Sequence, residues 1–163
     1  MAAQKKRLAH VCILVKDLDQ AIKDYTAILS IVDPKQLEKQ IVRYEDFGYG
    51  NERMKWATFP APGDACEIQL AQPLTPGTPM YERLQKKGEG VHHICFTATD
   101  IDEVCNDLKK KGIALTGDPV TDEATIPNQR WTFISPKAGH GLLIELARTY
   151  DAVKGKWVVA KKA

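Results

Sequence analysis

Two stretches of this 163-residue chain share one pattern of hydrophobic and polar positions. Residues 8–15 (LAHVCILV) and 91–98 (VHHICFTA) each alternate around a histidine, and a period of two predicts a β-strand. After each of them an aspartate is followed by apolar residues at helical spacing, which predicts helices over Leu18–Leu29 and Ile101–Lys111. Each half of the chain is therefore expected to begin with a strand and a helix.

The two stretches are related by a fixed offset of 83 residues without a gap. The identical pairs are His10 and His93, Cys12 and Cys95, Asp17 and Asp100, Asp19 and Asp102, and Asp24 and Asp107. A second similarity, at an offset of 76, relates EIQLA at Glu67–Ala71 to LIELA at Leu143–Ala147. Self-similarity of this kind indicates an internal duplication.

Shorter patterns complete each half as a βαβββ module. The further predicted strands are Ile41–Tyr44, Arg53–Phe59 and Ala65–Ala71 in the first module, and Ile113–Leu115, Arg130–Ile134 and Gly141–Leu146 in the second. Pro73–Pro79 carries prolines and a glycine and predicts a linker, followed by a short helix over Met80–Lys87.

We predict a single domain over residues 1–163, in which module one spans about 8–73 and module two about 90–147, with the linker and short helix at 74–89 between them. Residues 148–163 form a tail. Its end, KWVVAKKA, could add an edge strand or cross to a partner, and both remain open.

Composition narrows the class of protein. An apolar content of 44% is enough to build a core, and the longest apolar runs are far below the roughly 20 residues that span a bilayer. The basic start lacks the apolar centre of a signal peptide, so a cytoplasmic location and no membrane partner are expected. A net charge of +2 is too small to indicate a nucleic-acid partner.

Four polar side chains, two per module, fall on one face of equivalent strands. His10 and His93 lie on the first strand of each module, and Gln69 stands where Glu145 stands on the last, opposite the apolar Ile–Leu pairs. Two imidazoles and two oxygen donors suit a divalent metal ion such as cobalt, manganese, nickel, iron or zinc. A lone histidine on a strand is more often structural, and Gln69 alone would be an ordinary polar residue, but the repeat favours a shared site.

These features resemble the vicinal oxygen chelate (glyoxalase/bleomycin-resistance/dioxygenase) superfamily over about Leu8–Ala147. Within it, the pairing of GVHHICF with SPKAGHGLLIEL is most similar to the methylmalonyl-CoA epimerase family. The resemblance implies an α+β fold of two tandem βαβββ modules that form a cupped mixed sheet with helices on the convex face. It also implies a homodimer and metal ligation by His10, Gln69, His93 and Glu145.

The implied activity is epimerisation of a 2-substituted malonyl-CoA, so the expected partner is an acyl-CoA thioester. A metal-stabilised enolate would form when a base removes the proton next to the thioester. The resemblance assigns one base to Glu145 and the other to Glu52, with Asn51 also possible because the segment GYGNERMKWATF departs from the family pattern. His92, on the opposite strand face from His93, is expected to pack or to support the site.

Two other functions remain open at this point. A glyoxalase I-like lactoylglutathione lyase would use the same four ligands on a thiol-derived hemithioacetal. A non-catalytic small-molecule binding protein of the same fold would typically lack the metal set. A ring-cleaving dioxygenase is disfavoured, because those enzymes use three protein ligands and longer chains.

Overall fold

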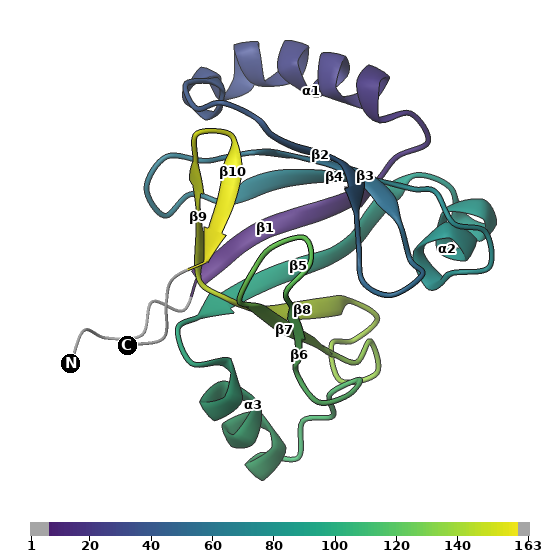
Figure 1. Ribbon diagram of the computed structural model, residues 1–163, viewed down its shortest axis with the longest axis vertical. Helices are drawn as coiled ribbons and strands as arrows, with labels where there is room; N and C mark the ends of the chain where they lie inside the picture. Colours follow the sequence, from purple (N-terminus) through teal and green to yellow (C-terminus); the bar gives the residue numbers. More distant parts are fainter. Residues whose placement is uncertain (1–6, 160–163) are drawn as a thin grey trace.

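A computed structural model describes residues 7–159 of the chain. Eight strands form one curled mixed sheet in the order β2-β3-β4-β1-β5-β8-β7-β6 (Figure 1). The strands are β1 (Arg7–Leu14), β2 (Val42–Phe47), β3 (Met54–Phe59), β4 (Glu67–Pro73), β5 (Gly90–Ala98), β6 (Val120–Asp122), β7 (Gln129–Ile134) and β8 (Leu143–Arg148). The helices are α1 (Leu18–Val32), the 3₁₀ turn η1 (Pro34–Leu37), α2 (Pro79–Lys87) and α3 (Ile101–Lys110). The predicted α+β fold with a cupped mixed sheet is confirmed.

The helices α1 and α3 lie on the outside of the sheet, one against each module (Figure 1). Both begin at the aspartates related by the offset of 83: Asp17 accepts a hydrogen bond from Gln20 N, and Asp100 accepts one from Glu103 N. Such a cap stabilises a helix start by about 1 kcal/mol. The duplicated aspartates therefore set the same strand-to-helix turn in each module.

The two modules meet at the centre of the sheet, where β1 pairs antiparallel with β5. In this register His10 lies opposite Cys95 and Cys12 opposite His93. Each central strand has the last strand of its own βαβββ module, β4 for β1 and β8 for β5, as its parallel neighbour on the other side. The modules consequently pair within one chain.

Most predicted elements agree with the structure to within a few residues, and one does not. Ile113–Leu115 is not a strand, since Leu115 makes only an isolated bridge to Ile134. The edge strand is β6, which begins after Pro119. Proline has no backbone N–H to donate to a sheet, so pairing starts beyond it.

The tail folds back on its own chain as a hairpin of β9 (Tyr150–Val153) and β10 (Lys156–Val159), a separate two-stranded sheet. Its turn residues Lys154 and Gly155 both have positive φ angles, 50° and 71°, as the tight turns favoured in β-hairpins require. Tyr150 and Trp157 are buried in a core cluster together with Trp56. The hairpin thus packs against the cup beside β2 and β3 as a separate sheet and not as an edge strand (Figure 1). Residues 160–163 of the predicted tail lie outside the described residues.

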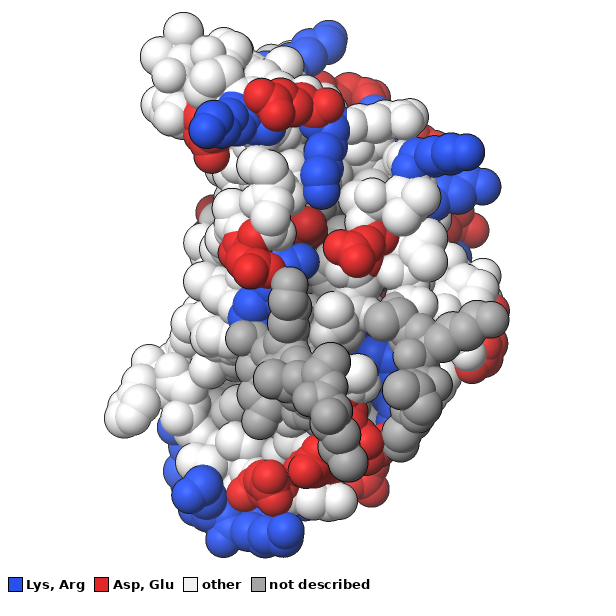
Figure 2. All heavy atoms as spheres, turned by 90° about the vertical axis from the view of Figure 1, so that its left-hand side faces the viewer, with Lys and Arg blue, Asp and Glu red and all other residues white. Residues whose placement is uncertain are grey.

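Acidic and basic side chains are interspersed on the face that carries the two ends of the described chain (Figure 2). No helix within residues 7–159 is long and apolar enough to cross a membrane.

Candidate metal centre

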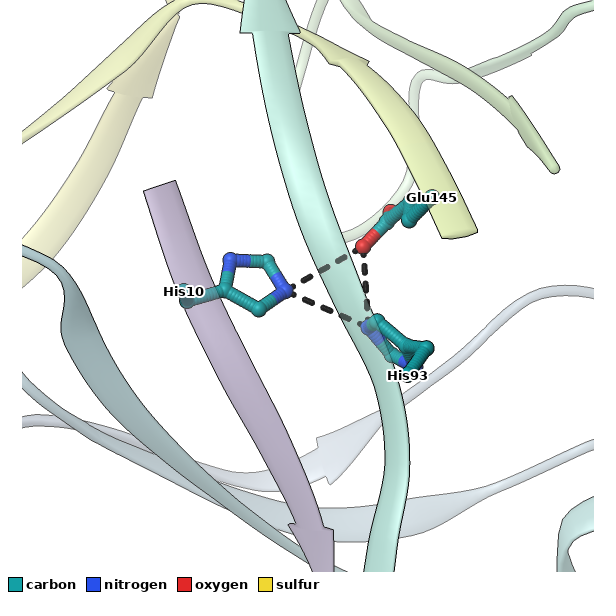
Figure 3. A group of neighbouring side chains, drawn as sticks. All are labelled: His10, His93 and Glu145. Carbon is teal, nitrogen blue, oxygen red and sulfur yellow. Dashed lines mark hydrogen bonds and ion pairs between the residues drawn. The ribbon is translucent and has the colours of Figure 1, made fainter. Parts of the chain in front are cut away.

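Three side chains from three neighbouring strands converge inside the cup (Figure 3). His10 projects from β1, His93 from β5 and Glu145 from β8. His10 Nε2 lies 3.2 Å from His93 Nε2, and Glu145 Oε2 lies 3.2 Å from His10 Nε2 and 3.0 Å from His93 Nε2. The three groups meet because β1, β5 and β8 are adjacent and the strand period turns all three side chains to the same face.

The protonation states of His10 and Glu145 suit metal binding. Burial lowers the pKa of His10, although Glu145 opposes this shift, so the imidazole is held neutral. Burial alone would raise the pKa of Glu145, but hydrogen bonds from His10 and His93 and the electrostatic interaction with both side chains lower it overall, well below its usual range. Neutral imidazole and anionic carboxylate are the forms in which these side chains ligate a metal.

The outer ring nitrogens of both histidines are also engaged. His10 Nδ1 lies 2.7 Å from the Tyr150 hydroxyl, and His93 Nδ1 lies 2.8 Å from His92 Nδ1. His92 reaches its neighbour because β5 carries a bulge at this point, between the pairs Cys12–His93 and Ile13–Val91. Both Nε2 atoms are therefore turned toward Glu145.

The two remaining candidates, Gln69 and Glu52, line the same cavity, and Glu52 is not part of the group of three that converges. Gln69 is buried on β4, beside β1. Glu52 lies just before β3, and its Oε1 accepts a hydrogen bond from Met80 N, 2.8 Å away, at the start of α2. Glu52 thus has a structural contact at a helix N-terminus as well as a place at the cavity wall.

The cavity has a volume of about 160 Å³, and most of its wall is apolar. Trp56 stacks on Phe47 with ring centroids 4.7 Å apart and packs against Trp157 of the hairpin at 5.3 Å. Across the cavity, Tyr49 from the β2–β3 loop meets Trp131 of β7 edge-on at 5.4 Å. Both modules and the hairpin therefore enclose the cluster in a setting of low polarity, where charge interactions are stronger than in water.

A divalent metal ion fits this donor set. Two imidazole nitrogens and a carboxylate oxygen already converge, no cysteine within residues 7–159 belongs to the cluster, and Gln69 could add a second oxygen donor. Three or four protein ligands leave positions open for water or substrate oxygens, as catalytic metal sites require.

Sequence reasoning missed the aromatic residues of the tail. Tyr150 contacts His10 and Trp157 lines the cavity, yet both lie beyond the duplicated modules. Apolar alternation in YDAV and KWVV around Lys154-Gly155 was the available signal for a hairpin. It is a weak one, because asparagine or aspartate is the usual residue before the glycine in this turn.

The curled sheet of two βαβββ modules, with its candidate metal centre inside the cup, is typical of a known class of proteins. The chain belongs to the glyoxalase/bleomycin resistance protein/dioxygenase superfamily, whose family model matches residues 9–133.

Several relatives within that superfamily carry one activity in their names. The mitochondrial methylmalonyl-CoA epimerase of Homo sapiens is 32% identical over 143 residues, which cover 86% of this chain and 72% of the human protein. An ethylmalonyl-CoA/methylmalonyl-CoA epimerase of Cereibacter sphaeroides is 29% identical, with coverage of 86% and 96%. The crystal structure of methylmalonyl-CoA epimerase from Mycobacterium tuberculosis superposes with a TM-score of 0.66 at 30% identity and covers 87% of each chain.

Proposed function

We propose that the protein is a metal-dependent epimerase of a 2-substituted malonyl-CoA. The observation that carries the proposal is the convergence of His10, His93 and Glu145 in a cavity that also presents Glu52. The epimerase relatives named above supply the substrate class, an acyl-CoA thioester.

The proposed ligands are His10, Gln69, His93 and Glu145. A divalent metal held by them would supply positive charge for a substrate carboxylate and for the charge that develops on the thioester oxygen. Of the described residues that line the cavity, none is a lysine or arginine, so the protein itself offers no competing cation there.

Epimerisation needs proton transfer on two faces of one carbon, and three carboxylates line the cavity: Glu52, Asp122 and Glu145. Asp122 Oδ1 already accepts hydrogen bonds from Ala124 N and Thr125 N, which leaves Glu145 and Glu52, from different modules, as the candidate bases. Glu145 comes from β8 in module two and Glu52 from the loop before β3 in module one. Each would have to lie within about 3 Å of the proton that it moves. The lowered pKa of Glu145 favours ligation and weakens it as a base, so Glu52 is the more informative residue to test.

The test is solvent exchange. Metal-loaded protein incubated with methylmalonyl-CoA in deuterated water should incorporate deuterium at the α-carbon, measured by mass spectrometry, and metal-free protein should not. The glutathione hemithioacetal of methylglyoxal should remain unconverted.

Two other outcomes would replace the proposal. Conversion of the hemithioacetal without α-proton exchange would assign the protein as a glyoxalase I-like lyase, which uses the same donor set. Failure of the metal-loaded protein to act on either substrate would favour a non-catalytic binding protein of this fold.

A further inference from the structure

The C-terminal hairpin touches the candidate metal centre through one residue. Tyr150, the first residue of β9, is 3% exposed, and its hydroxyl lies 2.7 Å from His10 Nδ1. Its ring packs against Trp157 of β10, with ring centroids 3.5 Å apart. The tyrosine is therefore fixed by the hairpin and points at the one ring nitrogen of His10 that faces away from Glu145.

The internal duplication shows what this contact replaces. In module two, His93 has its Nδ1 atom 2.8 Å from the adjacent His92. At the offset of 83, the residue of module one that corresponds to His92 is Ala9, which is fully buried and has no polar side chain. Module one thus carries the equivalent histidine but lacks the equivalent partner, and the hairpin, 140 residues further along the chain, supplies a hydroxyl at that nitrogen.

A histidine that ligates through Nε2 carries its proton on Nδ1, and an acceptor at Nδ1 fixes both this tautomer and the ring orientation. We propose that Tyr150 is the positioning residue for His10, taking for module one the part that His92 takes for module two. The inference rests on the proposed metal-dependent function. It makes the hairpin, which lies outside both modules, a part of the metal centre.

The first experiment compares zinc affinity in two variants, each of which removes one tyrosine hydroxyl group that makes a contact of the hairpin. Tyr150→Phe removes the partner of His10 but keeps the ring that packs on Trp157. Tyr44→Phe is the matched control, because the Tyr44 hydroxyl accepts a hydrogen bond from Trp157 N, 3.2 Å away, at the same hairpin, and does not contact His10. We expect the zinc dissociation constant, from competition with a chelator, to rise about 10- to 100-fold in Tyr150→Phe and to change little in Tyr44→Phe.

A second readout reports on the tautomer directly. In ¹⁵N NMR spectra of the zinc-loaded protein, His10 should be protonated at Nδ1, with the proton protected from exchange with water, and Tyr150→Phe should lose that protection. His92→Phe should weaken zinc binding by a comparable factor through His93.

Unchanged zinc affinity in Tyr150→Phe, or an equal loss in Tyr44→Phe, would overturn the positioning role. Absence of zinc binding in the unaltered protein would instead overturn the proposed metal-dependent function.

Discussion

At the scale of single residues, Glu52 has two roles to consider, one at the cavity wall and one at the start of helix α2. It lines the cavity, and it accepts a hydrogen bond from Met80 N at the start of α2, where Thr78 makes no side-chain cap. A carboxylate at a helix N-terminus is stabilising, because the backbone N–H groups there have no partner within the helix. The position of Glu52 is therefore compatible with a structural role, a catalytic role or both.

Glu52→Gln separates these roles. The amide oxygen can still accept from Met80 N, so folding and zinc affinity should change little, while a base is lost and turnover should fall about 100-fold or more. Deuterium should still wash into one epimer through the remaining base. Glu45→Gln serves as the control, since Glu45 is exposed on β2, paired with Arg43, and does not line the cavity. Normal turnover in Glu52→Gln would remove this residue from the mechanism.

Glu67, two residues before Gln69, is a buried acid with an incomplete set of contacts. It is 3% exposed, and within residues 7–159 its Oε2 has no hydrogen-bond partner. Burial raises its pKa to about 7, against a smaller opposing effect of Arg7. The folded state therefore holds this proton more tightly than the unfolded state, so ionisation costs stability as the pH rises from about 4.5 toward 7.

Glu67→Gln should remove that cost. Metal-free Glu67→Gln should be more stable than the unaltered protein at pH 8, by roughly 1–3 kcal/mol, and the difference should shrink below pH 5, where both side chains are neutral. Urea unfolding at the two pH values measures it. A difference that does not depend on pH would show that Glu67 titrates normally in the folded protein.

At the scale of elements, the duplicated pattern was sufficient to predict the two central strands, both capped helices and the three residues that converge. His10, His93 and Glu145 were found because alternation and the repeat assign each to a face of a strand, and a face is a local property. His92 was expected on the opposite strand face, packing or supporting the site, but its direct contact with His93 was not predictable, because a β-bulge depends on how β1 and β5 pair.

The C-terminal hairpin could not be predicted from the sequence for a related reason. Its strands have four residues each, and its contacts join Trp157 to Tyr44 and Trp56, about a hundred residues away in the chain. Short strands are stabilised mainly by the residues that they pack against, and the local sequence does not show which residues those are. The proposed role of Tyr150 consequently needed the structure, even though the duplication supplied the comparison with Ala9.

At the scale of the whole molecule, the pairing of β1 with β5 determines whether the candidate metal centre is built from one chain or from two. Both strands belong to one chain, so His10 and His93 come from the same molecule, and Glu145 follows on β8 beside β5. A homodimer, predicted from the family resemblance, would then hold two independent centres. If the modules instead exchanged between chains, each centre would combine His10 of one copy with His93 of the other.

Mixing two variants that each fail to bind zinc distinguishes these arrangements. His10→Ala and His93→Ala should each lose stoichiometric zinc, because each removes one donor from the cluster, while the sheet and its capped helices remain. When the two variants are unfolded together in urea and refolded as a mixture, zinc binding should stay absent, since no chain carries both histidines. The unaltered protein taken through the same procedure should recover its zinc, as measured by elemental analysis. Recovery of zinc in the mixture would mean that β1 and β5 can pair between chains, because an exchanged dimer of the two variants contains one centre with both histidines.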